Sequence, residues 1–109
     1  MSTEPDILER VRAASAKRRL YVPHALRQMA RPDRMIATHE VRAVVEHGEL
    51  VEDYPADPRG HSCLILGFGG DGRPIHVVCS PKEDYLAIIT AYLPDGQEWT
   101  DGFRVRRST

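Results

Sequence analysis

The segment from His61 to Leu93 constrains the fold more than any other part of the chain. It holds three runs rich in β-branched and aromatic residues, at 62–68, 74–80 and 85–93, and Gly, Pro and Asp residues separate these runs. The first turn, at 69–72, reads Gly-Gly-Asp-Gly, and glycine supplies the positive φ angles that hairpin turns need. Because consecutive strands joined by short turns pair with one another, the segment predicts an antiparallel meander.

Helical patterns precede this segment. Apolar residues recur at helical spacing between 7 and 14, after a start at Thr3 that is expected to cap the helix. A second, short helix is predicted from Pro23 until Pro32 stops it, and a third over 39–47, which Gly48 ends. The acidic run at 49–54 predicts a further strand at an exposed edge.

These elements predict an α+β fold in which N-terminal helices pack on a mostly antiparallel sheet of three to five strands. We expect residues 1–22 to be an N-terminal helix extension and residues 23–109 to form a single α+β domain. Trp99 is expected to pack back onto the body of the domain. Residues 103–107 suit either a short terminal strand or a frayed basic tail.

Composition narrows the possible functions. The chain of 109 residues has 15 Lys and Arg against 16 Asp and Glu, so its overall charge favours neither nucleic acid nor a membrane. Any basic surface must therefore be local, and neither DNA nor a membrane is predicted as a partner. Two cysteines without an export signal fit a reducing cytosol, which makes cytoplasmic the expected localisation.

Two groups of residues could carry chemistry. The first is His76 with Thr90 and Tyr92, which could supply a proton-transfer group, a hydroxyl donor and a stacking surface. They share a sheet face if the hairpin pairs residues whose numbers add to an even value, and lie on opposite faces otherwise. The sequence leaves this register open, and a half-buried histidine beside ordinary strand residues is the alternative interpretation.

The second group is His24 with Arg27, Arg31 and Arg34. Neighbouring arginines disfavour a charged imidazole, so His24 could act as a base near neutral pH. The arginines could bind phosphate and neutralise the charge that develops during phosphoryl transfer. The alternative is that all four are solvated residues of a short helix and the loop after it.

Three motifs in the chain resemble the bacterial domain-of-unknown-function 4258 family. They are Pro23-His-Ala-Leu-Arg-Gln-Met29, Gly72-Arg-Pro-Ile-His-Val-Val78 and Ile89-Thr-Ala-Tyr-Leu-Pro94. The resemblance runs from about Pro23 to Leu93 and departs at 31–37, so the family arginine can correspond to Arg31 or to Arg34.

The resemblance implies a function. Members of this family are similar in element order to ribonuclease toxins of the RelE, MqsR and BrnT type, and some are encoded beside an antitoxin-like protein. This implies a toxin-like endoribonuclease that cleaves RNA without a metal or other cofactor, with an antitoxin and RNA or the ribosome as partners. His24 or His76 would move protons, with Thr90 as a hydroxyl donor, the arginines would hold phosphate, and Tyr92 would stack on a base.

Metal binding and partner binding are the two other hypotheses for this sequence. Five histidines and two cysteines are numerous enough to bind a metal, but no Cys-x-x-Cys or His-x-x-x-His spacing is present, so no metal site is predicted. A non-catalytic protein-binding domain is the alternative function, in which a sheet edge and the Arg18–Arg19 end of the first helix would dock a companion protein.

Overall fold

The computed structural model describes residues 6–107 of the chain. Thr3, the predicted helix cap, lies outside the described residues. The first helix, α1, runs from Ile7 to Lys17, and the Asp6 side chain accepts a hydrogen bond from the backbone N–H of Glu9 at 2.8 Å. An N-cap carboxylate of this kind satisfies a free N–H group and suits the positive end of the helix dipole.

The other elements follow the predicted order closely. Helices α2 and α3 span Pro23–Met29 and Thr38–His47. Strands β1 (Arg19–Tyr21), β2 (Glu49–Tyr54), β3 (Ser62–Phe68), β4 (Pro74–Pro81) and β5 (Leu86–Tyr92) form one sheet in the order β1-β5-β4-β3-β2. Two short strands near the C-terminus, β6 (Trp99–Thr100) and β7 (Val105–Arg106), form a separate hairpin. The predicted α+β fold is confirmed.

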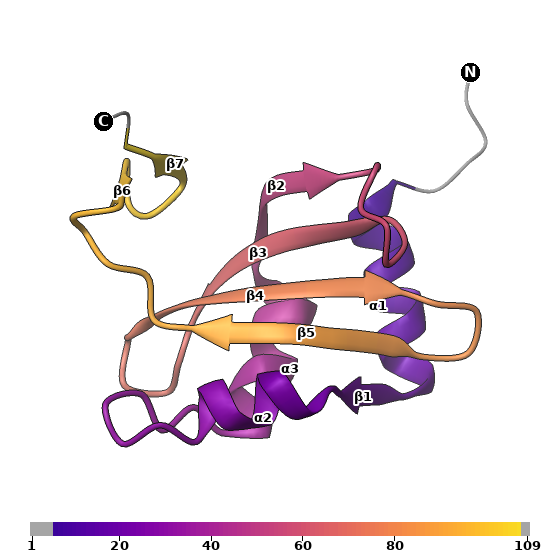
Figure 1. The fold of residues 1–109 in the computed structure, drawn as a ribbon, viewed down its shortest axis with the longest axis horizontal. Coiled ribbons are helices and arrows are strands. Elements are labelled where there is room, and N and C mark those ends of the chain that lie inside the picture. The colour runs from indigo at the N-terminus through magenta and orange to yellow at the C-terminus, as the bar shows by residue number, and fades with distance from the viewer. Residues whose placement is uncertain (1–5, 108–109) are drawn as a thin grey trace.

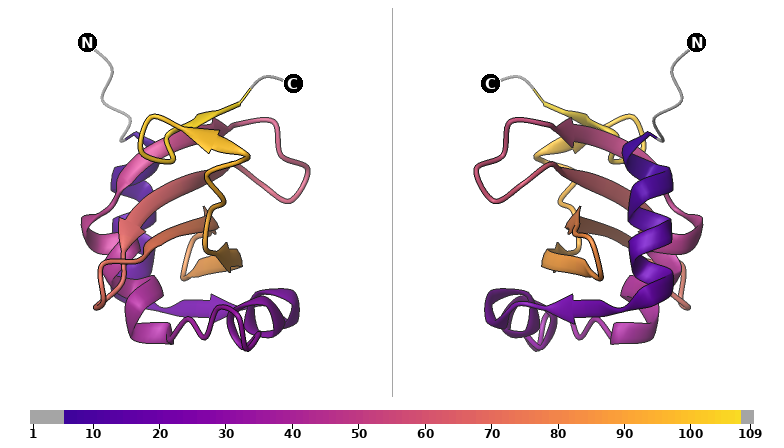
Figure 2. Two further views of the ribbon diagram at one scale, coloured as in Figure 1. Left: turned by 90° about the vertical axis from the view of Figure 1, so that its left-hand side faces the viewer. Right: turned by 90° about the vertical axis from the view of Figure 1, so that its right-hand side faces the viewer.

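The sheet has one covered and one open face. Helices α1 and α3 lie behind it in Figure 1, and the side views in Figure 2 show both on the same face. Helix α2 packs along β5 at the lower edge, and the β6–β7 hairpin lies over the other end of the sheet. The core between helices and sheet consists of fully buried aliphatic and thiol side chains, including Val11, Val41, Val45, Cys63, Ile65, Ile75, Val77, Cys79 and Ile88.

Helix α1 also contributes to this core, although β1 separates it from α2 and α3 in the sequence. Ile7, Val11 and Ala14 are buried on its inner face and pack into the same cluster as the strands. None of the helices within residues 6–107 has the length and apolar character needed to cross a membrane.

Helix α3 approaches the sheet most closely at Gly67 in β3. A Cβ atom on Gly67 would lie 2.7 Å from Cγ2 of Val44 and 2.9 Å from its Cα, closer than carbon atoms can pack. A glycine in the middle of a strand is costly unless another backbone needs the space. Here it lets the apolar face of α3 sit directly on the sheet.

The short strand β1 was not predicted from the sequence. It pairs in parallel with β5, with Leu20 opposite Ala87, and a hydrogen bond from the Val22 N–H to the Ile88 carbonyl extends this contact. A three-residue strand leaves no periodic pattern to recognise. Its pairing depends on a strand more than sixty residues further along the chain.

A β-bulge at Ile89 decides which residues share the open face. Cys79 pairs with Ile88, but Val78 pairs with Thr90 and His76 with Tyr92, so Ile89 is an extra residue on β5. An inserted residue turns every side chain beyond it to the other face. The bulge therefore places His76, Thr90 and Tyr92 together on the face that lacks helices.

Candidate functional site on the open sheet face

His76 is the centre of a hydrogen-bonded group on the open face. Its side chain is completely buried, with Nδ1 3.1 Å from the Tyr92 hydroxyl oxygen and Nε2 2.9 Å from the Phe103 carbonyl oxygen. Because a carbonyl only accepts hydrogen bonds, Nε2 carries the proton and Nδ1 accepts from Tyr92. Both nitrogens are occupied, so in this arrangement His76 can act on a substrate only through Tyr92.

The protonation states of this pair follow from their surroundings. Burial lowers the pKa of His76. The Phe103 carbonyl and the Glu52 carboxylate raise this pKa, but they offset the effect of burial only in part. Burial also raises the pKa of Tyr92. A neutral imidazole therefore faces a neutral phenol near pH 7, and the imidazole has a free lone pair for the phenolic proton.

Thr90 and Tyr92 are the accessible members of the group. Both are half-buried and point to the same face of β5, two residues apart. Beneath them the strands β3 and β4 contribute Leu64, Leu66 and Val78, of which both leucines are fully buried. Tyr92 thus lies half-buried beside apolar residues of the neighbouring strands.

A second polar group lies beside His76 on β2. Glu52 accepts hydrogen bonds from the Tyr54 hydroxyl and from Nε of Arg106, the latter at 3.0 Å. Burial raises the pKa of Glu52, but these two donors outweigh it and hold the pKa below its ordinary value. Burial, with the hydrogen bond to Glu52, raises the pKa of Tyr54 to about 12. The Glu52 carboxylate is therefore ionised near pH 7 and contributes a negative charge near His76.

The loop between α2 and α3 brings Arg34 to the same corner. Its guanidinium hydrogen-bonds to Gln28. Burial raises the pKa of Tyr92, and the charge of Arg106, with a smaller effect from Arg34, lowers it. Arg73, in the turn before β4, donates to the carbonyls of Arg34 and Met35 and pairs with Glu40 at 3.3 Å. Arg73 therefore holds the loop in place, and with it the position of Arg34.

The remaining predicted site residues differ in how free they are to bind a ligand. His24 and Arg27 are exposed on α2, the helix that packs against β5. Arg31 is exposed and forms an ion pair with Asp33 at 3.3 Å. Among the residues that the structure describes, neither Arg27 nor Arg34 pairs with a carboxylate. Of the two arginines in the loop, Arg34 is the one whose charge acts on the pKa of Tyr92.

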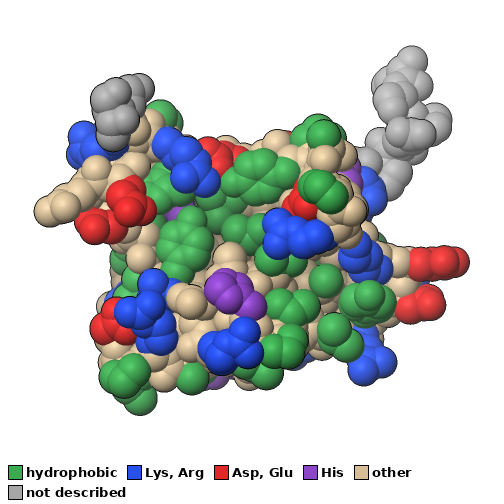
Figure 3. All heavy atoms as spheres, viewed as in Figure 1, with side chains coloured by type: hydrophobic (Ala, Val, Ile, Leu, Met, Phe, Trp, Pro, Cys, Tyr) green, Lys and Arg blue, Asp and Glu red, His purple; other side chains and the backbone are tan. Residues whose placement is uncertain are grey.

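Figure 3 shows the face that carries this group. Hydrophobic side chains gather over its middle, and Lys and Arg side chains surround them, with a few acidic side chains toward the rim. Exposed Leu20 and Leu26 add to the apolar surface at the β1 and α2 edge. An apolar floor bordered by cations suits a ligand with flat rings and negative charges.

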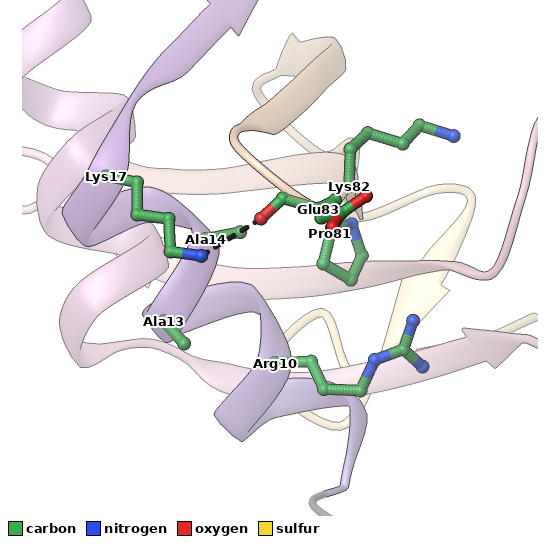
Figure 4. Close-up of a pocket in the computed structure, with 7 residues that line it drawn as sticks. All are labelled: Arg10, Ala13, Ala14, Lys17, Pro81, Lys82 and Glu83. Carbon is green, nitrogen blue, oxygen red and sulfur yellow. Dashed lines mark hydrogen bonds between the residues drawn. The ribbon is translucent and has the colours of Figure 1, made fainter.

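Another hollow, of about 310 Å³, lies between α1 and the turn from β4 to β5. In Figure 4, the Lys17 ammonium donates to the Glu83 carbonyl oxygen at 3.0 Å, while Lys82 points away from the hollow. None of the predicted site residues lines it. Within residues 6–107, no three His, Cys, Asp or Glu side chains come together as potential metal ligands.

Sequence reasoning overlooked Glu52, Arg73, the Phe103 carbonyl and Arg106. Arg73 had a usable signal, because it lies in the same short motif as His76. Glu52 alternates with Tyr54 on an edge strand, where an acidic residue is unremarkable. The Phe103 carbonyl left no signal, since a backbone group is present at every position.

The comparisons with known proteins identify one family. A model described as "Domain of unknown function (DUF4258)" matches residues 21–93. This range includes α2, α3 and the strands β2 to β5, but only the last residue of β1, and it excludes α1 and the β6–β7 hairpin. No curated protein and no solved structure matches the chain.

Proposed function

The chain belongs to the DUF4258 family, and we propose that its open sheet face is the active site of a toxin-like endoribonuclease. The observation that carries the proposal is the hydrogen bond from Tyr92 to the neutral His76 on the sheet face that lacks helices, where the charge of Arg34 also acts on Tyr92. It couples a half-buried tyrosine to a fully buried proton acceptor.

The proposed reaction uses the 2′-hydroxyl of RNA as the nucleophile. Tyr92 takes the proton of the 2′-hydroxyl while its own proton moves to Nδ1 of His76, and the 2′-oxygen attacks the adjacent phosphorus. The bond to the 5′-oxygen breaks, and that oxygen takes a proton from His24 or from water. The products are a 2′,3′-cyclic phosphate and a 5′-hydroxyl end.

Charges around the site support this sequence of proton transfers. The imidazolium that forms at His76 is stabilised by the carboxylate of Glu52, whose field favours the protonated ring. Arg34 and Arg27 would bind the phosphate and the negative charge that builds up on it. Tyr92 offers a ring face, and the exposed leucines an apolar surface, on which bases could stack.

The near-neutral net charge of the chain argues for recruitment rather than tight binding to free RNA. Affinity for RNA rises with the number of phosphates that cations neutralise, and this face offers few unpaired arginines. We therefore propose that a larger partner such as the ribosome presents the RNA. By the same proposal, an antitoxin protein keeps the enzyme inactive.

The decisive experiment is cleavage of a labelled RNA by the purified protein, alone and with ribosomes, in the presence of a chelator. Tyr92→Phe should lower the cleavage rate by roughly 100-fold or more, the usual share of a general base. Tyr85→Phe, in the turn before β5, is the matched control and should leave the rate unchanged. If no RNA is cut under either condition, the chain is not a ribonuclease.

A second candidate function is protein binding without catalysis. A hollow of about 350 Å³ at the corner of α3, β2 and β3 is lined partly by Leu66 and by Phe68, whose side chain is 55% exposed. An exposed aromatic beside a hollow suits the anchor residue of a partner. Loss of binding to a co-purifying partner in Phe68→Ala, together with the absence of any RNA cleavage, would favour this alternative.

A further inference from the structure

The turn of the β6–β7 hairpin has an unusual backbone. Asp101, Gly102 and Phe103 have φ angles of 52°, 63° and 71°, all in the left-handed region. Glycine adopts this region freely, but Asp and especially Phe do so at a cost of about 1 kcal/mol or more each. Such a turn persists only where contacts elsewhere hold it, and strained residues of this kind gather at functional sites.

The strained turn directs one polar group at the candidate site. It turns the Phe103 carbonyl toward the sheet, where it accepts the Nε2 proton of His76. The hairpin is otherwise lightly attached, because it forms a sheet of its own and most of its side chains are exposed. Its main anchor is Trp99, which is 2% exposed and meets the His76 ring edge-on with centroids 4.5 Å apart.

Two charged contacts complete the attachment. The Arg106 guanidinium lies 4.6 Å from the Trp99 ring centroid and pairs with Glu52, and Arg104 pairs with Glu49 at 2.6 Å. The two ion pairs connect the hairpin to β2, whereas the contact between Arg106 and Trp99 lies within the hairpin. The hairpin also lies outside residues 21–93, the part of the chain that the family model matches.

We propose that the Asp101–Phe103 turn is a positioning clamp, whose carbonyl holds the His76 ring with its proton on Nε2 and its Nδ1 lone pair toward Tyr92. An imidazole held at one nitrogen only could rotate about its Cβ–Cγ bond and turn a proton or a carbon toward the phenol. The clamp prevents this. Its catalytic consequence rests on the proposed ribonuclease function, whereas its effect on the His76 ring can be measured without any substrate.

The test exploits the backbone of Phe103. Phe103→Gly and Phe103→Val both remove the aromatic ring, but glycine accepts a φ of 71° and a β-branched residue strongly resists it. In nitrogen-15 NMR spectra of the full chain, the wild type and Phe103→Gly should show a slowly exchanging Nε2 proton on His76. Phe103→Val should lose that signal, and its His76 should titrate closer to the ordinary histidine range as water reaches the ring.

Two results would overturn the clamp. One is a protected Nε2 proton in Phe103→Val, which would show that the turn does not hold the ring. The other is loss of the proton in Phe103→Gly, which would assign the effect to the aromatic side chain. If Phe103→Val does not fold, Asp101→Val and Asp101→Gly pose the same question in the same turn. The fluorescence of Trp99, the single tryptophan of the chain, reports whether the hairpin stays docked.

Cleavage assays separate this inference from the proposed function. If the wild type cuts RNA, Phe103→Val should lose roughly 100-fold in kcat, as expected when a catalytic group is misplaced by about 1 Å, and Phe103→Gly should lose little. If the wild type cuts no RNA but the protected proton behaves as expected, the clamp stands as a structural device and the ribonuclease proposal fails alone.

Discussion

The hydroxyl of Tyr92 lies 3.1 Å from Nδ1 of His76, across the pairing of β4 with β5. The contact exists because Ile89 is an extra residue in β5. If the register that pairs Cys79 with Ile88 continued along the two strands without the bulge, His76 and Tyr92 would project from opposite faces of the sheet. A single bulge thus creates the pair on which the proposed chemistry depends.

Because His76 is buried in its neutral form, acid should destabilise the fold. The pKa of His76 in the folded protein is lowered from 6.5 by burial, so the unfolded chain binds the proton first as the pH falls through 6.5. Stability should therefore decrease below that pH and be insensitive to His76 above it. We expect urea unfolding at several pH values to show a steeper loss for wild type than for His76→Gln, which retains the other four histidines. Parallel curves would contradict a buried neutral histidine.

Replacement of Gly67 should disturb the contact between α3 and β3. In Gly67→Ala the new methyl group would overlap Val44, and overpacking of this kind costs roughly 1–3 kcal/mol in the free energy of unfolding. Gly70→Ala is the control, because a Cβ atom there meets nothing within 4 Å. Chemical denaturation of the two variants should separate them clearly, and equal stability would mean that the helix and strand lie further apart than described.

The carboxylate of Glu40 should stabilise the loop that carries Arg34. It accepts a hydrogen bond from the Ala37 N–H at 3.0 Å and pairs with Arg73, and the first of these contacts is the main reason its pKa is lowered. Glu40→Ala leaves the Ala37 N–H without this partner and removes one ion pair of Arg73, so it should cost roughly 1–3 kcal/mol in the free energy of unfolding.

The control for this experiment is Glu46→Ala on the same helix. Glu46 pairs with Arg42 on the exposed side of α3, where solvent screens the interaction, so its loss should have a much smaller effect. Equal losses in the two variants would show that the Glu40 contacts are no stronger than a surface ion pair.

RNA binding should distinguish Arg34 from Arg31. Arg34 has no carboxylate partner among residues 6–107 and its charge acts on Tyr92, whereas Arg31 is already paired with Asp33. Binding of a single-stranded RNA should weaken in Arg34→Gln, and the slope of log affinity against log salt should fall by about 0.7 for one lost phosphate contact. Arg31→Gln should change the slope much less. The reverse order would make Arg31 the phosphate ligand.

Much of the fold could be predicted from the sequence, because local patterns carry it. The strands at 62–68 and 74–80, the third helix and the packing of Trp99 against the body follow from periodicity, turn residues and burial. Cys63 and Cys79 are buried in neighbouring strands, as expected for thiols in apolar runs. The family resemblance likewise depended on contiguous motifs and is confirmed over residues 21–93.

The candidate site could be predicted only in part. The sequence named His76, Thr90 and Tyr92 but left their register open, since a run of apolar residues pairs acceptably in either register. It also treated His76 as an accessible proton-transfer group or a half-buried residue, whereas the structure buries it completely and occupies both of its nitrogens. His24 and Arg27 carry no sequence signal of their surroundings, and only the tertiary structure shows that they are exposed on a helix that packs against β5.

The sequence by itself determined the identity and order of the elements, because helix and strand patterns depend on residues within a few positions of one another. Tertiary structure alone decided the bulge at Ile89, the pairing of β1 with β5, the ion pair that occupies Arg31, and the Phe103 carbonyl that holds His76. Each of these depends on groups far apart in the chain, or on backbone atoms that every residue shares. No local pattern encodes such contacts, and they exist only once the sheet and the hairpin have folded together.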